Sequence, residues 1–279
     1  MASLVTDDNH TTTTTTTRRR TTTTEASEGT HFEDLPGILQ ICIGTATKPG
    51  LIAYFDDDIL AMINMFAKTC KKFLEYDPLR CYYFRVVLTK KYGVNFDDSR
   101  VILDGKNIRD EDLQSIGEAL KANNTLTTLD LDNNNITDVQ SIGELLKTNN
   151  TLTMLNLNNN NIFDVQSIGE GLKSNKTLEI LDLGNNYITD VQSIGEALKT
   201  NNTLWSLTLS YNKITDDSGI QSIIDGLKTN NTLRYLRLIN NQLSDNMKYT
   251  QLDAIEQYKR DGSNGYQQVE EMRIVTSLW

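Results

Sequence analysis

The sequence has few of the residues on which disulfide-rich, zinc-binding and membrane proteins depend. Three cysteines, two histidines and three prolines occur among 279 residues. Cys42, Cys70 and Cys81 form an odd-numbered set without C-x-x-C spacing, which favours reduced thiols and argues against a zinc site. No run of about 18 apolar residues occurs, so we expect neither a membrane-spanning helix nor a membrane partner.

Basic charge is also scarce. Lysine and arginine total 27 against 37 aspartates and glutamates, which gives a net charge of -10. Nucleic-acid-binding proteins usually carry a basic stripe, so we expect no nucleic-acid partner and favour a protein partner. The N-terminus has Asp7 and Asp8 where a secretory signal would place basic and then apolar residues. We therefore expect a cytoplasmic protein, with the nucleus as the alternative because Arg18, Arg19 and Arg20 form a short basic run.

The dominant feature of the sequence is a repeat. The pattern Leu-x-x-Leu-x-Leu-x-x-Asn-x-Ile/Leu occurs five times, starting at Leu126, Leu152, Leu178, Leu204 and Leu233. The starting leucines are separated by 26, 26, 26 and 29 residues (126 to 152 to 178 to 204 to 233). Such periods are typical of solenoids, in which stacked units share one continuous core.

The first half of each unit predicts a short strand followed by a bend. Leu129 and Leu131 alternate with period two and point inward. Asn134 lies at the bend, where its side chain can satisfy buried backbone groups, and stacked copies predict an asparagine ladder. A second asparagine begins an N-x-T sequon in every unit, which we interpret as turn chemistry rather than glycosylation because no secretion signal accompanies it; its copies are Asn123, Asn149, Asn175, Asn201 and Asn230.

The second half of each unit predicts a short helix. Thr137-x-x-Gln140 has the spacing of a capping box, and Asp164 is the expected cap in the unit where Phe163 replaces the threonine. Val139, Ile142 and Leu146 would form the buried stripe of this helix. Gly143 is expected to permit close approach of the helix to the sheet.

These units resemble the leucine-rich repeat family, specifically its ribonuclease-inhibitor-like class, and the linking phrase Leu-Lys-Thr-Asn-Asn-Thr-Leu is typical of that class. The resemblance covers about Asp98 to Asp245 and implies an α/β horseshoe with a concave parallel sheet and short convex helices. Residues 95–122 read as a degenerate first unit. The whole chain then divides into a disordered Thr/Arg-rich tail (1–30), a small helical module (31–94), the repeats (95–245) and a C-terminal cap (246–279).

The helical module resembles an F-box. The motif Asp34-Leu35-Pro36-Gly37-Ile38 is followed by an apolar helix ending Phe66-Ala-Lys-Thr-Cys-Lys-Lys-Phe73 and then by Asp77-Pro78. Proteins with an F-box and leucine-rich repeats are substrate receptors of cullin–RING ubiquitin ligases, which would place adaptor binding on Leu35, Pro36, Ile38, Phe66 and Phe73. The alternative is that this module is only a cap on the repeats.

No catalytic, cofactor or metal motif is present, so we expect a non-enzymatic protein without a cofactor. The outward strand positions change from small and acidic to aromatic and basic along the repeats, and these residue types dominate protein interfaces. We therefore predict a partner-binding concave surface formed by Glu179, Asp182, Trp205, Tyr211, Arg234, Tyr235 and Arg237. Alternative functions are a free-standing ribonuclease-inhibitor-like or tropomodulin-like binding protein, and a GTPase-regulating repeat protein.

Overall fold

The computed structural model describes residues 85, 87–96, 98–121, 123–215, 218–253, 256 and 273–276, with backbone only for 249–251. The F-box-like motif, its five adaptor-binding residues, the N-terminal tail and the three cysteines lie outside these residues. The predictions made for them therefore stay predictions.

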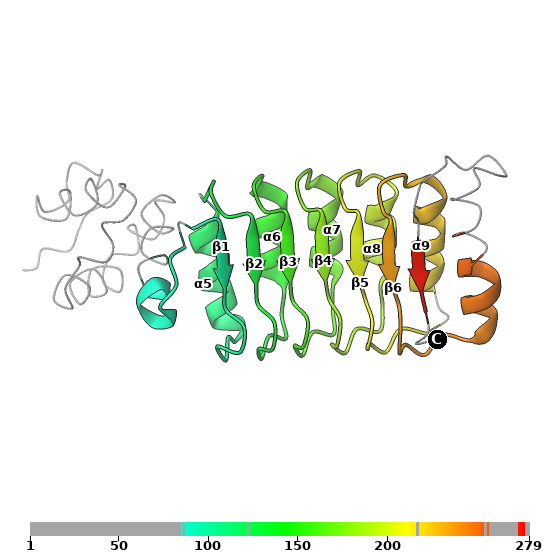
Figure 1. The fold of residues 1–279 in the computed structure, drawn as a ribbon, viewed down its shortest axis with the longest axis horizontal. Helices are drawn as coiled ribbons and strands as arrows, with labels where there is room; N and C mark the ends of the chain where they lie inside the picture. Colours follow the sequence, from blue (N-terminus) through cyan, green and yellow to red (C-terminus); the bar gives the residue numbers. More distant parts are fainter. Residues whose placement is uncertain are drawn as a thin grey trace, which may run out of the picture.

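The described residues form a solenoid built on one parallel sheet, as the repeat predicted (Figure 1). Its seven strands lie side by side in sequence order, and they are β1 (Arg100–Ile102), β2 (Thr128–Asp130), β3 (Met154–Asn156), β4 (Ile180–Asp182), β5 (Ser206–Thr208), β6 (Tyr235–Arg237) and β7 (Arg273–Val275). The degenerate first unit supplies β1. The sequence predicted a C-terminal cap over 246–279, whereas in the structure Arg273–Val275 pairs with β6 and continues the sheet.

Helices cover one face of the sheet and leave the other face open (Figure 1). They are α5 (Asp110–Leu120), α6 (Gln140–Thr148), α7 (Gln166–Ser174), α8 (Gln192–Leu198) and α9 (Ser218–Thr229), and a short π-helix, η3 (Met247–Leu252), follows the last repeat. None of the helices in the described part of the chain combines the length and apolar character that crossing a bilayer requires.

The core lies between the sheet and the helices and runs through every repeat. The central residue of each repeat strand is a fully buried leucine in register with the next: Leu129, Leu155, Leu181, Leu207 and Leu236. Burial of one such side chain stabilises the fold by about 1.5–3 kcal/mol. Leu88 and Phe96 close the N-terminal end of the same core.

Two ladders of asparagines join the repeats, one at each turn of the chain. In the first, Asn160 donates from Nδ2 to the carbonyl oxygens of Leu131 (3.0 Å) and Leu157 (3.2 Å), and its Oδ1 accepts from the backbone of Ile136 (3.1 Å). In the second, the sequon residue Asn175 donates to the carbonyl of Leu146 (2.9 Å) and accepts from the backbone of Leu178 (2.7 Å). The predicted asparagine ladder and the predicted turn role of the sequon asparagines are both confirmed.

Two details of the helices differ from the prediction. Gln140 is already the first residue of α6, and its backbone N–H donates to Oδ1 of Asp138 at 2.8 Å, so aspartate rather than Thr137 satisfies the helix terminus. The equivalent aspartates, Asp164 and Asp190, accept from Gln166 and Gln192 in the same way. The predicted capping box is therefore wrong. Asp164 supplies the expected side-chain acceptor, but the N-cap residue of α7 is Val165, one position later.

Gly143 permits close approach to the next helix, not to the sheet. A Cβ on Gly143 would lie 2.3 Å from the backbone oxygen of Ser167, at the start of α7. Gly169 and Gly195 face Ser193 and Ser222 in the same manner. These glycines set the spacing of successive helices, which must match the spacing of the strands for the repeats to stack.

Candidate functional site

The open face of the sheet carries rows of outward side chains that the strand register brings together. One row joins Asp182, Thr208 and Arg237, and a parallel row joins Ile180, Ser206 and Tyr235. Neighbouring strands lie about 4.8 Å apart, so Asp182 and Arg237 are separated by about 10 Å with only the short Thr208 between them.

Trp205 lies immediately before β5, and its backbone links it to both neighbouring repeats. Its N–H donates to the carbonyl of Glu179 (2.9 Å), and its carbonyl accepts from the N–H of Arg234 (2.8 Å). The side chains of Glu179 and Arg234 are exposed on either side of it. The indole meets the Tyr235 ring edge to face, with centroids 5.6 Å apart and an interplanar angle of 70°.

The structure thus gathers six of the seven residues predicted for partner binding. We call this surface the concave patch and define it as Glu179, Asp182, Trp205, Arg234, Tyr235 and Arg237. Trp205 and Tyr235 are half-buried, whereas both arginines are exposed. An aromatic pair flanked by guanidinium groups is the combination that most often contributes binding energy at protein interfaces.

Charge on this face is unevenly distributed. Burial raises the pKa of the Asp182 carboxyl above its ordinary value, and the nearby Asp132 and Asp130 raise it further. The Gly184 N–H, which donates to Oδ1 of Asp182 at 2.8 Å, and the positive charge of Arg237 act in the opposite direction and do not cancel the rise in pKa. Asp130, Asp132 and Asp182 thus make the sheet acidic around β2 and β4, whereas Arg237 makes it basic at β6.

Tyr211, the seventh predicted residue, does not lie on the concave patch. It follows β5 and lies in the turn at the edge of the sheet. Six residues separate it from Trp205, so the two backbones can be at most about 20 Å apart. Its neighbours there are Tyr187 and Lys213, which the sequence analysis did not single out. Tyr187 and Lys213 occupy the same position in two successive repeats, and the repeat before them has Asn161 there. Comparison of the repeats could therefore have found both residues as departures from asparagine.

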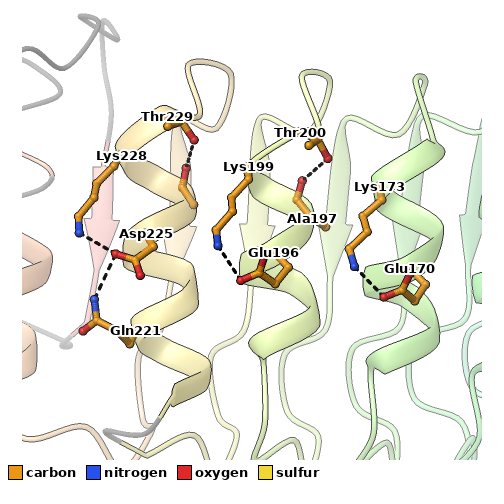
Figure 2. Close-up of polar contacts among 11 residues, drawn as sticks. Glu170, Lys173, Glu196, Ala197, Lys199, Thr200, Gln221, Asp225, Lys228 and Thr229 are labelled. Atoms are coloured by element: carbon orange, nitrogen blue, oxygen red, sulfur yellow. Dashed lines mark hydrogen bonds and ion pairs between the residues drawn. The ribbon is translucent and has the colours of Figure 1, made fainter.

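The helical face shows a different kind of charge arrangement. Glu170–Lys173, Glu196–Lys199 and Asp225–Lys228 form ion pairs of 2.7, 2.6 and 2.6 Å between residues three positions apart on the helices or, for Lys199, at the helix C-cap (Figure 2). Exposed pairs of this type contribute little, typically below about 1 kcal/mol, and satisfy each other's charge. In the described ranges no three His, Cys, Asp or Glu side chains gather closely enough to hold a metal ion.

Comparison with known proteins adds a family match and two distant structural likenesses. A family model described as "Leucine Rich repeat" matches residues 122–139, 174–191 and 200–221. An internalin (inlF) from Listeria monocytogenes is 20% identical with a TM-score of 0.40, covering 60% of this chain and 37% of the internalin chain. The structure "Leiomodin-1 Actin-Binding Site 2" is 24% identical with a TM-score of 0.39, covering 60% of this chain and 83% of the other. No curated protein sequence matches this chain.

Proposed function

Because the chain is a leucine-rich-repeat solenoid, we propose that it is a non-enzymatic protein–protein interaction scaffold that binds its partner through the concave patch. The observation that carries this proposal is the Trp205–Tyr235 pair, 5.6 Å apart and flanked by the exposed Arg234 and Arg237. Within the described residues, the helical face presents one exposed aromatic side chain, Phe163, rather than an aromatic pair. Small molecules usually bind in pockets that enclose most of their surface, so an open sheet face suits a macromolecular partner better.

The chemistry of the patch specifies the partner. Two guanidinium groups favour carboxylates, which they bind with paired hydrogen bonds, and the aromatic pair favours an apolar side chain between them. The carboxylates of Asp130, Asp132 and Asp182 would repel an acidic segment that lay over β2 to β4. The preferred partner therefore carries an acidic, partly apolar segment that lies across β5 and β6, with any basic residues directed toward Asp182 and Glu179.

Affinity purification with the full chain tests this proposal. We expect wild-type protein to retain a partner that Trp205→Ala and Arg237→Ala each release, with a loss of at least about 2 kcal/mol in binding free energy and unchanged circular dichroism. Glu170→Gln on the helical side is the matched control and should bind as wild type. Equal binding by all three variants would remove the concave patch from the interaction.

We also propose, from the sequence resemblance alone, that residues 31–94 are an F-box-like module that attaches the scaffold to a cullin–RING ubiquitin ligase in the cytoplasm. Leu35→Asp combined with Pro36→Ala should abolish adaptor binding, because a docking helix cannot bury an unpaired charge. Partner binding at the concave patch should be unaffected. Wild-type protein that binds a partner but no cullin adaptor is instead a free-standing binding protein, and accelerated GTP hydrolysis by a bound GTPase would identify a GTPase regulator.

A further inference from the structure

A groove lies at the turn edge of the solenoid, beyond the carboxyl ends of β4 and β5. It has a volume of about 470 Å³ and is lined by asparagines of three successive turns together with Tyr187, Tyr211 and Lys213. This volume lies in the range of about 300–1,000 Å³ typical of small-ligand sites. None of the residues lining the groove carries a carboxylate, in contrast to the acidic rows of the sheet.

Tyr211 adopts a backbone conformation that the repeat normally reserves for asparagine. Its φ is 58°, and the equivalent positions in the other units, all with positive φ, are Asn107, Asn133, Asn159, Asn185 and Asn240. A left-handed conformation is unfavourable for a bulky side chain and better tolerated by asparagine. The Tyr211 side chain is 47% exposed, so burial in the core does not compensate for the strain. Strain retained at an exposed aromatic residue points to a ligand.

Tyr187 presents a second exposed ring beside it, 49% accessible. The Nζ of Lys213 lies 4.6 Å from the centroid of this ring, a cation–π contact that holds the ring in place. Both tyrosines line the groove from neighbouring turns and are exposed rather than packed in the core.

Amide groups complete the lining. The Asn185 side chain donates to the side chain of Asn159, and both residues are exposed. An amide both donates and accepts hydrogen bonds, which matches the hydroxyl groups of a sugar. The aliphatic C–H face of a sugar ring packs on an aromatic ring. An apolar protein partner fits less well, because it would bury the asparagine amides without hydrogen-bonding partners. A phosphate-rich ligand would require more basic residues than Lys213 alone.

We propose that this groove, hereafter the tyrosine groove, is a binding site for a neutral oligosaccharide, with Tyr187 and Tyr211 as stacking platforms and the exposed asparagines as hydrogen-bonding partners. The site is distinct from the concave patch and does not depend on the function proposed for it. The two surfaces can be occupied by different ligands because they lie on different faces of the solenoid.

The experiment is a screen of the full chain on an array of neutral oligosaccharides, followed by calorimetric titration of the sugar retained most strongly. Three variants restore the residue that a neighbouring repeat has: Tyr211→Asn, Tyr187→Asn and, as a control on the opposite side, Phe163→Thr. Phe163 is also an exposed aromatic, 62% accessible, but lies at the helical face. We expect both tyrosine variants to weaken binding by about tenfold or more and the phenylalanine variant to bind as wild type.

Tyr211→Asn also separates loss of the site from loss of the fold, because it should raise the melting temperature while it lowers affinity. Trp205→Ala should leave sugar binding unchanged. Absence of binding to every neutral sugar, retention only of sulfated or sialylated sugars, or binding that survives both tyrosine substitutions would each overturn the proposal.

Discussion

The Trp205 indole packs edge to face on the Tyr235 ring although the two residues belong to adjacent repeats, 30 positions apart in the sequence (205 to 235), which the pairing of β5 with β6 brings together. Leu204 and Leu233, which start these repeats, are equivalent residues of the pattern, so the contact is a diagonal one between adjacent units. The pair exists because the parallel register places the residue before β5 beside the first residue of β6. As a result, Trp205 and Tyr235, which both depart from the residues of the other repeats, together form one aromatic surface.

Tyr211→Asn should stabilise the protein. The substitution places asparagine at a φ of 58°, where five other units already have it, and removes the strain of a bulky residue. We expect a gain of about 0.5–1 kcal/mol in the free energy of unfolding, measured by urea denaturation. Tyr187→Asn, which involves no positive φ, should change the free energy much less. A loss of stability in Tyr211→Asn would show that the ring contributes packing that outweighs the strain.

Asn160→Ala should cost more stability than Asn161→Ala. Asn160 is 5% exposed and holds two repeats together through both ends of its amide, so its removal leaves buried carbonyl and N–H groups unpaired. The expected cost is about 1–3 kcal/mol, against a few tenths for Asn161, whose described contact to the neighbouring repeat uses only the backbone. Equal denaturation midpoints would contradict the role assigned to the ladder.

Gly143→Ala should destabilise the stack of helices, and Gly117→Ala provides the matched comparison. The new Cβ at position 143 would lie 2.3 Å from a backbone oxygen, whereas at position 117 the nearest atom is a side-chain carbon at 3.2 Å. We expect a cost of about 1–3 kcal/mol at position 143. At position 117 the higher helix propensity of alanine offsets much of the crowding. Thermal denaturation of both variants measures the difference. A higher melting temperature for Gly143→Ala than for wild type would show that α6 and α7 can move apart without a loss of stability.

Asp110 should make stability depend on pH at the first repeat junction. Burial acts to raise the pKa of its carboxyl, but hydrogen bonds from the Thr137 hydroxyl and from the backbone of Asp138 and Thr137 lower it below the ordinary value of 3.8. Because the pKa in the folded state is the lower one, the stabilisation is complete above pH 3.8 and is lost as the pH falls through the folded value.

Asp110→Asn tests this link, since the amide oxygen can still accept from the backbone N–H groups of Thr137 and Asp138, while the charge and the acceptor for the Thr137 hydroxyl are lost. The variant should have a lower urea midpoint than wild type at pH 6 and a smaller difference from wild type at pH 3, because the stabilisation declines as the pH falls below 3.8. Asp112, whose pKa is also lowered, serves as an internal reference because it remains in both proteins. The same difference at both pH values would show that the carboxylate charge contributes nothing.

The repeat pattern predicted the sheet, the buried leucines and both roles of asparagine, because these depend on residues that recur at fixed spacing. It did not show that Asp138, rather than Thr137, accepts the hydrogen bond from the first N–H of α6, since both residues precede the helix closely and only the three-dimensional geometry distinguishes them. It also did not place Gly143 against the next helix. That contact depends on the distance between repeats, which no single repeat encodes.

The concave patch could be predicted because strand alternation fixes which side chains point away from the core. The prediction failed for Tyr211, which is three residues past the end of β5, where alternation no longer holds and the turn directs the side chain to the edge. Repeat alignment contained the necessary signal: Tyr211 is the only residue other than asparagine at the six positive-φ positions among the described repeats. The conformation, and hence the strain, became visible only in three dimensions.

The most direct test of the concave patch is hydrogen exchange of the full chain, alone and in complex with the partner recovered by affinity purification. The amides of residues 205–208 and 234–237 should become protected on binding, while those of α6 to α8 remain unchanged. Slower exchange confined to the strands would support the scaffold function through Trp205, Arg234, Tyr235 and Arg237. Protection of the helices with unchanged exchange in β5 and β6 would contradict it.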